Sequence, residues 1–192
     1  MKQMKHLLWG FFGILCVLQV GVIGVQIWSY ERILKEGEVY YFNVLPLDPY
    51  DAFRGRYVTL RFENANKAPT NETDIPENTS KAYAILEHNE NNDSIKEIRF
   101  SKPKGNDFLE VNVYSLPYKS TVQQDDASHF VYFSLTFDRF YMREDIAPQA
   151  EKLLRVLSGV KVKAKLRVLA GKGIIEDLMV GETSLSHYVL EQ

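Results

Sequence analysis

Two carboxylates and two guanidinium groups lie close together early in the chain, at Asp48, Asp51, Arg54 and Arg56, with Gly55 between the arginines. A pair of enclosed carboxyl groups can be pushed to different pKa values and then act as acid and base. Two arginines on one side of a strand entrance can hold an anion through bidentate hydrogen bonds. The same residue types also build ordinary turns, in which aspartates bond to the backbone and pair with nearby arginines. We therefore interpret these residues first as a structural corner and second as an acid–base or anion-binding site.

The sequence around them, residues 45–63, is typical of a rigid corner that leads into a strand. Pro46 and Pro49 fix φ and remove backbone donors, and Gly55 allows whatever φ the strand entrance requires. From Arg56 to Glu63 the side chains alternate as in a half-buried strand. We expect Val58, Leu60 and Phe62 on one face of this strand and Tyr57, Thr59 and Arg61 on the other.

The same stretch carries a resemblance to a known family. Gly55, Tyr57, Leu60 and Phe62 stand at the spacing of Gly-Asp-Tyr-x-x-Leu-x-Tyr, and the segment LPLDP before them matches Pro-x-Asp-Pro. On these residues the chain resembles the GDYXXLXY family, a group of mostly bacterial, membrane-anchored proteins of uncharacterised function. The segment FDRFY at 137–141, followed by a helix, is similar to the family's second half.

Two positions depart from the family's pattern. Arg56 stands where the motif has Asp, and Phe62 stands where it has its final Tyr. If the motif's Asp were a catalytic acid or a metal ligand, Arg56 would reverse the local charge and remove that role. The motif is therefore structural, or this member has lost an activity. Members are often encoded beside multi-pass membrane proteins, so the resemblance implies a subunit of a membrane complex.

Other candidate chemistry has little support in the sequence. Glu87, His88 and Glu90 include possible metal ligands, but His129 and His187 are isolated and no zinc signature is present. The sequence also lacks a P-loop, a nucleophile elbow and a dinucleotide-binding fingerprint. We therefore predict no catalytic residue, no metal and no cofactor, and an enzyme is the less favoured interpretation.

A long apolar run occupies the amino terminus. Residues 7–28 contain no formal charge and would span about 33 Å as a helix, enough for a hydrocarbon core of about 30 Å. Trp9 and Trp28 bracket the run where interfacial aromatic residues are expected. A cleavable signal peptide would have a shorter apolar region that ends in small residues. Cys16 follows Leu15, which does not fit a lipoprotein signal, so we predict a transmembrane anchor helix.

Charge around this helix predicts its orientation. Lys2 and Lys5 precede it, whereas a mixture of acidic and basic residues follows it. Under the positive-inside rule, residues 1–29 form a cytoplasmic amino terminus and the anchor, and residues 30–192 form one extracytoplasmic domain. Of the 23 basic residues, all but these two lysines lie in the domain, where 21 basic and 25 acidic residues give a formal charge of −4. That balance argues against nucleic acid as a partner, and the lone cysteine at position 16 excludes a disulfide within the domain.

The alternation of apolar residues predicts a mainly β, largely antiparallel domain of the α+β class. We expect one late helix over about 143–158, since Ile146, Ala150, Leu153, Leu154 and Leu157 recur at helical spacing. The polar segment 64–80 is expected to be a loop that is mobile or covers a site. The expected strands are 38–44, 56–63, 81–87, 94–102, 108–114, 130–141, 160–169 and 173–180.

Two surface features have ordinary explanations. Lys161, Lys163, Lys165 and Arg167 alternate along one strand, which favours a solvated strand face over a binding stripe. The glycosylation patterns that begin at Asn71, Asn78 and Asn92 apply only in a eukaryotic secretory pathway, so we interpret them as polar loops.

These observations favour a non-enzymatic function. We expect an accessory or interaction subunit of a cell-envelope membrane complex, whose partners are the lipid bilayer and one or more integral membrane proteins. Gln19 and Gln26 offer hydrogen bonds to a neighbouring helix within the bilayer. The alternative is a membrane-tethered enzyme or anion-binding receptor that uses the corner from Asp48 to Arg56.

Overall fold

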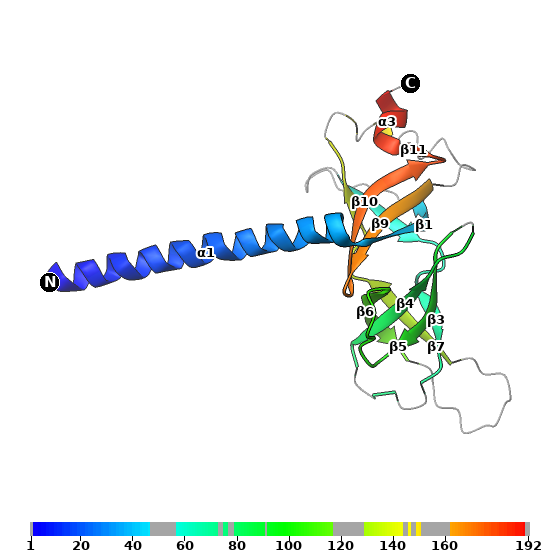
Figure 1. Ribbon diagram of the computed structural model, residues 1–192, viewed down its shortest axis with the longest axis horizontal. Helices are drawn as coiled ribbons and strands as arrows, with labels where there is room; N and C mark the ends of the chain where they lie inside the picture. Colours follow the sequence, from blue (N-terminus) through cyan, green and yellow to red (C-terminus); the bar gives the residue numbers. More distant parts are fainter. Residues whose placement is uncertain are drawn as a thin grey trace. The chain divides into compact units, whose positions relative to one another are not determined.

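Figure 1 shows a computed structural model of the chain. Two compact units are present, Met1–Glu36 and Gly37–Gln192, and each is described by itself. The residues that the structure describes are 2–46, 57–72, 75–76, 79–90, 92–116, 129–143, 146, 149–150 and 162–190.

The first unit is the helix α1 (Lys2–Glu36). Most of its apolar side chains are exposed, Trp9, Phe11 and Val20 among them, whereas Ile33 near its end is buried. The polar carboxy-terminal end of α1 is stabilised by ion pairs between residues four positions apart. Arg32 pairs with Glu36 at 2.8 Å, and Lys35 pairs with Glu31 at 3.2 Å. The helix is long and apolar enough to cross a membrane over Trp9–Glu36, a property that anchors and signal sequences share.

The second unit is built mainly from antiparallel strands, which confirms the predicted fold class. One sheet has six strands, with β1 in its interior between β9 and β2. The β1–β9 ladder forms the centre of this sheet and runs from Glu38 opposite Val168 to Val44 opposite Val162. The order and bounds in this sheet are β11 (Thr183–Ser184), β10 (Lys172–Val180), β9 (Val162–Leu169), β1 (Glu38–Pro46), β2 (Tyr57–Phe62) and β8 (Arg139–Tyr141).

The other sheet has five strands that come from the middle of the chain. All its neighbouring strands are antiparallel. Its two edge strands, β3 and β5, also contact each other, so this sheet curls round on itself. The order and bounds are β3 (Lys67–Thr70), β7 (His129–Leu135), β6 (Phe108–Ser115), β4 (Lys81–Glu87) and β5 (Ser94–Arg99).

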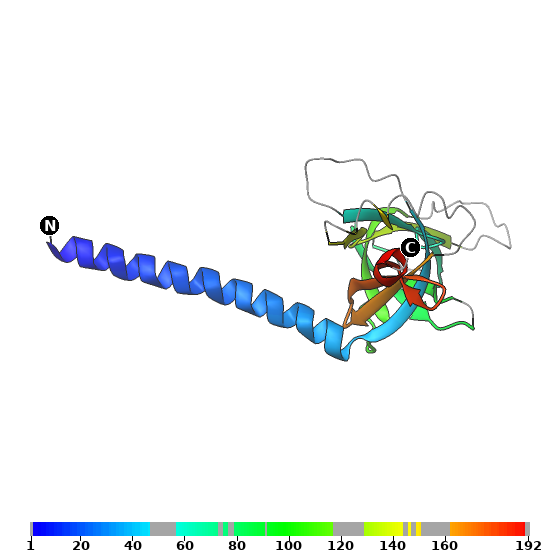
Figure 2. The ribbon, with the colours of Figure 1, turned by 90° about the horizontal axis from the view of Figure 1, so that it is seen from above.

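Backbone hydrogen bonds among the described residues join the sheets at two places. The tight hairpin between β9 and β10 has Ala170 and Gly171 at φ values of 51° and 89°, and its tip meets β6 where the Glu110 N–H donates to the Gly171 carbonyl at 2.8 Å. On the other side, Asp93 before β5 bonds to the backbone of Tyr41 in β1. Figure 2 shows the strands of both sheets arranged around a common interior.

One apolar cluster fills that interior. It takes Tyr40 and Leu166 from the first sheet and Ala84 and Val131 from the second, all at most 1% exposed. The short carboxy-terminal helix α3 (Leu185–Leu190) adds Leu185 to this cluster. Because both sheets and α3 share one core, the second unit is a single packing unit.

Two predicted elements differ from the structure, and a third lies mostly outside the described residues. The segment 64–80 contains β3, because Ala68 and Thr70 are buried and pair with β7. The aromatic segment 130–141 is divided into β7 and β8, which belong to different sheets. Of the predicted helix 143–158, helical residues are described only at 149–150, and 151–161 lie outside the described residues.

Candidate functional site

The corner that the sequence singles out lies between two adjacent strands. β1 ends at Pro46 and β2 begins at Tyr57, and the two strands pair antiparallel with Pro46 opposite Leu60. The corner therefore joins neighbouring strands of one sheet. The candidate site residues Asp48, Asp51, Arg54, Gly55 and Arg56 lie outside the described residues.

The described side chains that follow the corner belong to the core. Leu60 is 4% exposed and Phe62 is 8% exposed, whereas Arg61 between them is exposed, as the alternation predicts. The Phe62 ring packs edge to face against Phe42 at 6.3 Å and against Phe137 at 5.7 Å. Phe62 thus contributes to the core through aromatic packing.

The two stretches that carry the family resemblance lie side by side. β2 pairs with β8 over Tyr57 opposite Tyr141, Val58 opposite Phe140 and Thr59 opposite Arg139. The Leu60 N–H also donates to the Asp138 carbonyl at 2.8 Å. Segments far apart in the sequence thus form one structural pair.

The profile of the GDYXXLXY protein family matches residues 19–178, which is most of the chain. The chain belongs to the GDYXXLXY family. No curated protein and no solved structure matches it. In this GDYXXLXY protein, Leu60 and Phe62 at the motif's end are core residues, which favours a structural role for that half of the motif. Tyr57 is placed in β2 by its backbone, opposite Tyr141.

A connected polar cluster of described residues lies elsewhere, around Asp93. Its carboxylate accepts the Tyr41 N–H at 2.5 Å, and its own N–H donates to the Tyr41 carbonyl at 3.0 Å. Asp93 thereby satisfies both backbone groups of a β1 residue, as a neighbouring strand would. Only 7% of its side chain is exposed.

His88 completes this cluster. Its Nδ1 lies 2.9 Å from Asp93 Oδ1 and its Nε2 lies 3.3 Å from Glu38 Oε1. The imidazole also stacks on the Tyr40 ring, with centroids 4.4 Å apart and planes 1° from parallel. Carboxylates at both ring nitrogens require two N–H donors, so they favour the imidazolium form. The hydrogen bond to Asp93 accordingly raises the pKa of His88 above its usual value, with Glu38 adding to the shift.

This arrangement links β1 to the connection between β4 and β5. Both His88 nitrogens are engaged, so the ring has no free position at which to take a proton from a substrate. Burial and the neighbouring Glu38 raise the pKa of Tyr40, which keeps its hydroxyl protonated. Glu87 accepts the Ser94 hydroxyl at 3.0 Å instead of joining His88 and Glu90. Among the described residues no group of three or more His, Cys, Asp or Glu could hold a metal ion.

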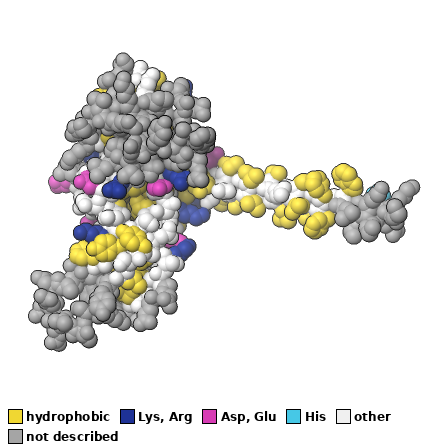
Figure 3. Space-filling model, turned by 180° about the vertical axis from the view of Figure 1, so that it is seen from behind, with side chains coloured by type: hydrophobic (Ala, Val, Ile, Leu, Met, Phe, Trp, Pro, Cys, Tyr) yellow, Lys and Arg dark blue, Asp and Glu magenta, His cyan; other side chains and the backbone are white. Residues whose placement is uncertain are grey.

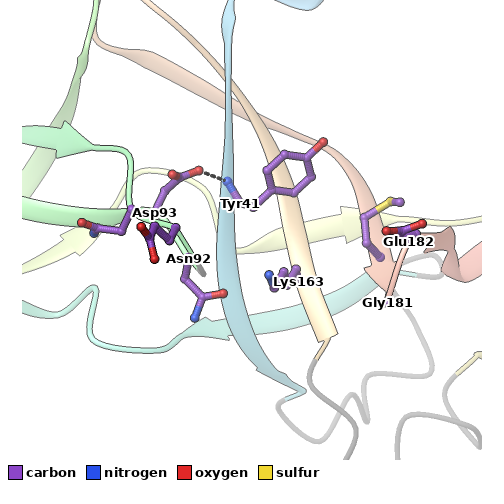
Figure 4. A pocket seen from close by; sticks show the side chains of 9 residues that line it. Tyr41, Asn92, Asp93, Lys163, Gly181 and Glu182 are labelled. Atoms are coloured by element: carbon purple, nitrogen blue, oxygen red, sulfur yellow. Dashed lines mark hydrogen bonds between the residues drawn. The ribbon is translucent and has the colours of Figure 1, made fainter.

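Two pockets adjoin Asp93. Figure 4 shows Asp93 bonded to Tyr41 on one side of β1, with Lys163, Gly181 and Glu182 on the other. This pocket measures about 360 Å³ and the second about 410 Å³, within the range of small-molecule sites. Such sites are usually lined by apolar side chains, whereas most of the residues around the first pocket are polar or charged. The first pocket is lined by Tyr41, Asn89, Glu90, Asn92, Asp93, Lys163, Met179, Gly181 and Glu182.

The basic side chains along β9 are not freely solvated. Lys165 and Arg167 both bind Glu176 of β10, at 2.9 Å and 2.6 Å, and each is only about a quarter exposed. Arg167 also donates to the Gly37 carbonyl at 3.1 Å. Glu176 sits at the β-bulge between Ile175 and Asp177, which turns its carboxylate toward the basic row. Lys165 and Arg167 therefore belong to an ion-pair network with Glu176, and the prediction of a solvated face was wrong at these two residues. Lys161 lies outside the described residues.

Sequence reasoning did not find Asp93 as the centre of a cluster. It appeared only as the middle of a glycosylation pattern in a polar turn. Its partner Tyr41 lies 52 residues away, and pairing at that separation leaves no local pattern. An aspartate directly before a strand was the one available signal, and many turns share it.

Proposed function

We propose that this GDYXXLXY protein is a single-pass membrane protein whose β domain lies outside the cytoplasm and serves as an accessory subunit of a cell-envelope membrane complex. The observation that carries the proposal is α1, whose apolar side chains face outward over a stretch long enough to span a bilayer. Lys2 and Lys5 before this stretch support a cytoplasmic amino terminus.

The domain's polar clusters support an interaction role over catalysis. The Asp93 cluster joins β1 to the strand β5, and Glu176 joins β9 to β10. Their charged groups are thus occupied in holding strands together. An enzyme or anion-binding receptor would depend on the corner from Asp48 to Arg56, and no observation on the described residues favours that alternative.

A pull-down tests the role as a subunit. The full chain and a version without residues 1–29 would be purified from the native membrane in mild detergent, and co-purifying proteins identified. We expect an integral membrane protein with the full chain. Gln19→Leu combined with Gln26→Leu should weaken this recovery if the partner binds through α1. Recovery of no membrane protein with either version would contradict the accessory role.

Cysteine labelling tests the membrane topology. Cys16 is the only cysteine, so Cys16→Ser gives a background for single reporters at Lys104→Cys in the domain and Lys2→Cys at the amino terminus. A membrane-impermeant maleimide applied to intact cells should label position 104 and not position 2. The intact mass of the membrane-bound chain should retain residues 1–29, and their loss would identify a cleaved signal sequence.

A further inference from the structure

The outer face of β3, β6 and β7 carries an aromatic patch, defined here as Tyr114, Phe130, Tyr132 and Lys67. Along β7 the side chains alternate, so that Val131 is fully buried while Phe130 and Tyr132 are 39% and 41% exposed. Figure 3 shows hydrophobic side chains gathered on the domain surface seen from behind, with basic side chains nearby. Clusters of exposed apolar side chains can mark interaction sites on soluble domains.

A β-bulge adds the most exposed member of the aromatic patch. In the β6–β7 ladder Val113 lies opposite Phe133 and Ser115 opposite Tyr132, so Tyr114 is an extra residue without a partner across the ladder. The bulge leaves Tyr114 63% exposed, with its ring centroid 6.3 Å from that of Tyr132. Bulges re-aim side chains in this way, and here the result is a larger continuous aromatic surface.

Lys67 gives the aromatic patch a positive charge. Its ammonium lies 5.6 Å from the centroid of the Phe130 ring, and its backbone pairs with Tyr132. Aromatic side chains with a polar tip are enriched where a protein meets the headgroups of a bilayer. A lysine near such rings can cover them with its apolar stem while its ammonium stays at the headgroups. The positive charge also complements lipid phosphates, although the domain as a whole is acidic.

The size of the aromatic patch argues against a protein as its occupant. A standard protein interface buries about 800 Å² on each side, with about 20 to 30 residues. Three partly exposed aromatic side chains cover a small part of that area. Contact with a lipid surface needs no such minimum area when the protein is already tethered to the membrane. The tether raises the effective concentration of the domain at the lipid surface, so a weak contact can form.

The chain supplies such a tether. Residues 29–36 of α1 follow the apolar run and span about 12 Å at the helical rise, and Gly37 alone separates α1 from β1. We propose that the aromatic patch inserts into the headgroup region of the bilayer that holds α1, with Lys67 paired to lipid phosphate. This inference rests on the proposed membrane anchor.

Tryptophan fluorescence tests the insertion with the full chain. Trp9→Phe and Trp28→Phe remove the native signal, and Phe130→Trp places a reporter in the aromatic patch. The protein would be reconstituted in vesicles of phosphatidylcholine and phosphatidylglycerol with bromine atoms near the upper end of the acyl chains. We expect a blue-shifted emission that the bromolipids quench and acrylamide does not.

A matched reporter tests whether insertion is specific to the aromatic patch. Tyr141→Trp lies in β8 of the other sheet, and Tyr141 is 66% exposed, similar to Tyr114. It should be quenched by acrylamide and not by bromolipid. Adding Lys67→Ala to the Phe130→Trp chain should lower the ratio of inserted to free domain about five-fold at low salt, the factor for about 1 kcal/mol per lysine at an anionic surface. Equal bromolipid quenching at positions 130 and 141 would contradict a specific patch.

A third reporter distinguishes failure of this inference from failure of the proposed membrane anchor. In a chain that keeps only Trp28, quenching by bromolipid reports α1 in the bilayer. If Trp28 is quenched and the Phe130→Trp reporter is not, the anchor stands and the aromatic patch does not bind lipid. If neither is quenched, the anchor itself fails. Protection of the Phe130→Trp reporter from acrylamide without bromolipid quenching would mean that a protein surface covers the patch, which also overturns the inference.

Discussion

At the scale of single residues, a methyl group at Gly171 would meet both an unfavourable φ and a buried side chain. Its φ of 89° is unfavourable for other residues, and a Cβ built there would lie 2.7 Å from Cε2 of Phe108, a side chain that is 1% exposed. We predict that Gly171→Ala lowers the free energy of unfolding by about 2 to 4 kcal/mol, from backbone strain plus core crowding. Thermal or denaturant unfolding followed by circular dichroism measures this.

Gly181 provides the control, because it has φ of 64° but nothing within 4 Å of a built Cβ. Gly181→Ala should therefore lower the free energy of unfolding only by the strain of the left-handed conformation, about 1 to 2 kcal/mol. Equal losses in the two variants would show that Phe108 gives way freely and that the hairpin tip is not tightly packed against β6.

The raised pKa of His88 predicts that the stability of the domain depends on pH. Its pKa is raised in the folded domain by Asp93 and Glu38, so its contribution is complete below the unfolded pKa of about 6.5 and is lost as the pH rises through the folded value. The side chain is 54% exposed, so solvent screens the ion pairs and the effect should stay below about 1 kcal/mol. The measurement is the difference in unfolding free energy between wild type and His88→Gln across about pH 5 to 9. A difference that grows toward high pH would contradict this assignment.

At the scale of elements, the connection between β4 and β5 supports β1 through the side chain of Asp93. Asp93→Ala removes the acceptor of the Tyr41 N–H and leaves His88 with one carboxylate. We predict a loss of about 1 to 3 kcal/mol, the cost of leaving a part-buried donor without its partner. Asp93→Asn keeps an acceptor oxygen, so it should lose less stability but should abolish most of the pH dependence assigned to His88.

Asp138→Ala is the matched control, since the Asp138 side chain is 60% exposed and lies 3.7 Å from its partner Arg139. It should change the unfolding free energy by less than about 0.5 kcal/mol. If Asp93→Ala is equally mild, solvent satisfies the Tyr41 N–H, and the contact does not hold the two sheets together.

Elements with a strong local pattern could be predicted from the sequence. β4 has the predicted bounds, and the turn at Ala170 and Gly171 falls in the short gap between the predicted strands 160–169 and 173–180. β3 was missed because its residues, KAPT, have weak strand propensity and become a strand through pairing with β7. α3 was missed because six residues are too few to show a helical period.

The site was predicted only in part for a related reason. Alternation along 56–63 correctly placed Leu60 and Phe62 on a buried face. The partners of those residues, such as Phe137, come from distant parts of the chain, and so does the Tyr41 partner of Asp93. Sequence spacing reports contacts within an element, whereas these contacts are created by the order of strands in the sheets.

At the scale of the whole molecule, the core of the second unit is formed from both sheets and α3 within residues 37–192. We predict that a chain of residues 37–192 folds in water without detergent and unfolds in one cooperative transition. Size-exclusion chromatography and thermal unfolding by circular dichroism test this. Aggregation, or a non-cooperative transition, would show that the domain needs α1 or the membrane.

The place of β1 in its sheet also determines when the domain can form during synthesis. The five strands of the β3–β7 sheet are complete once residue 135 has been made, and they pair with one another within the middle of the chain. β1 is made first, yet its main partner β9 comes much later, with Val168 opposite Glu38. During synthesis the curled sheet can therefore form early, whereas β1 lacks its partner β9 until the β9–β10 hairpin has been made. We expect this final, long-range pairing to be the slow step of folding.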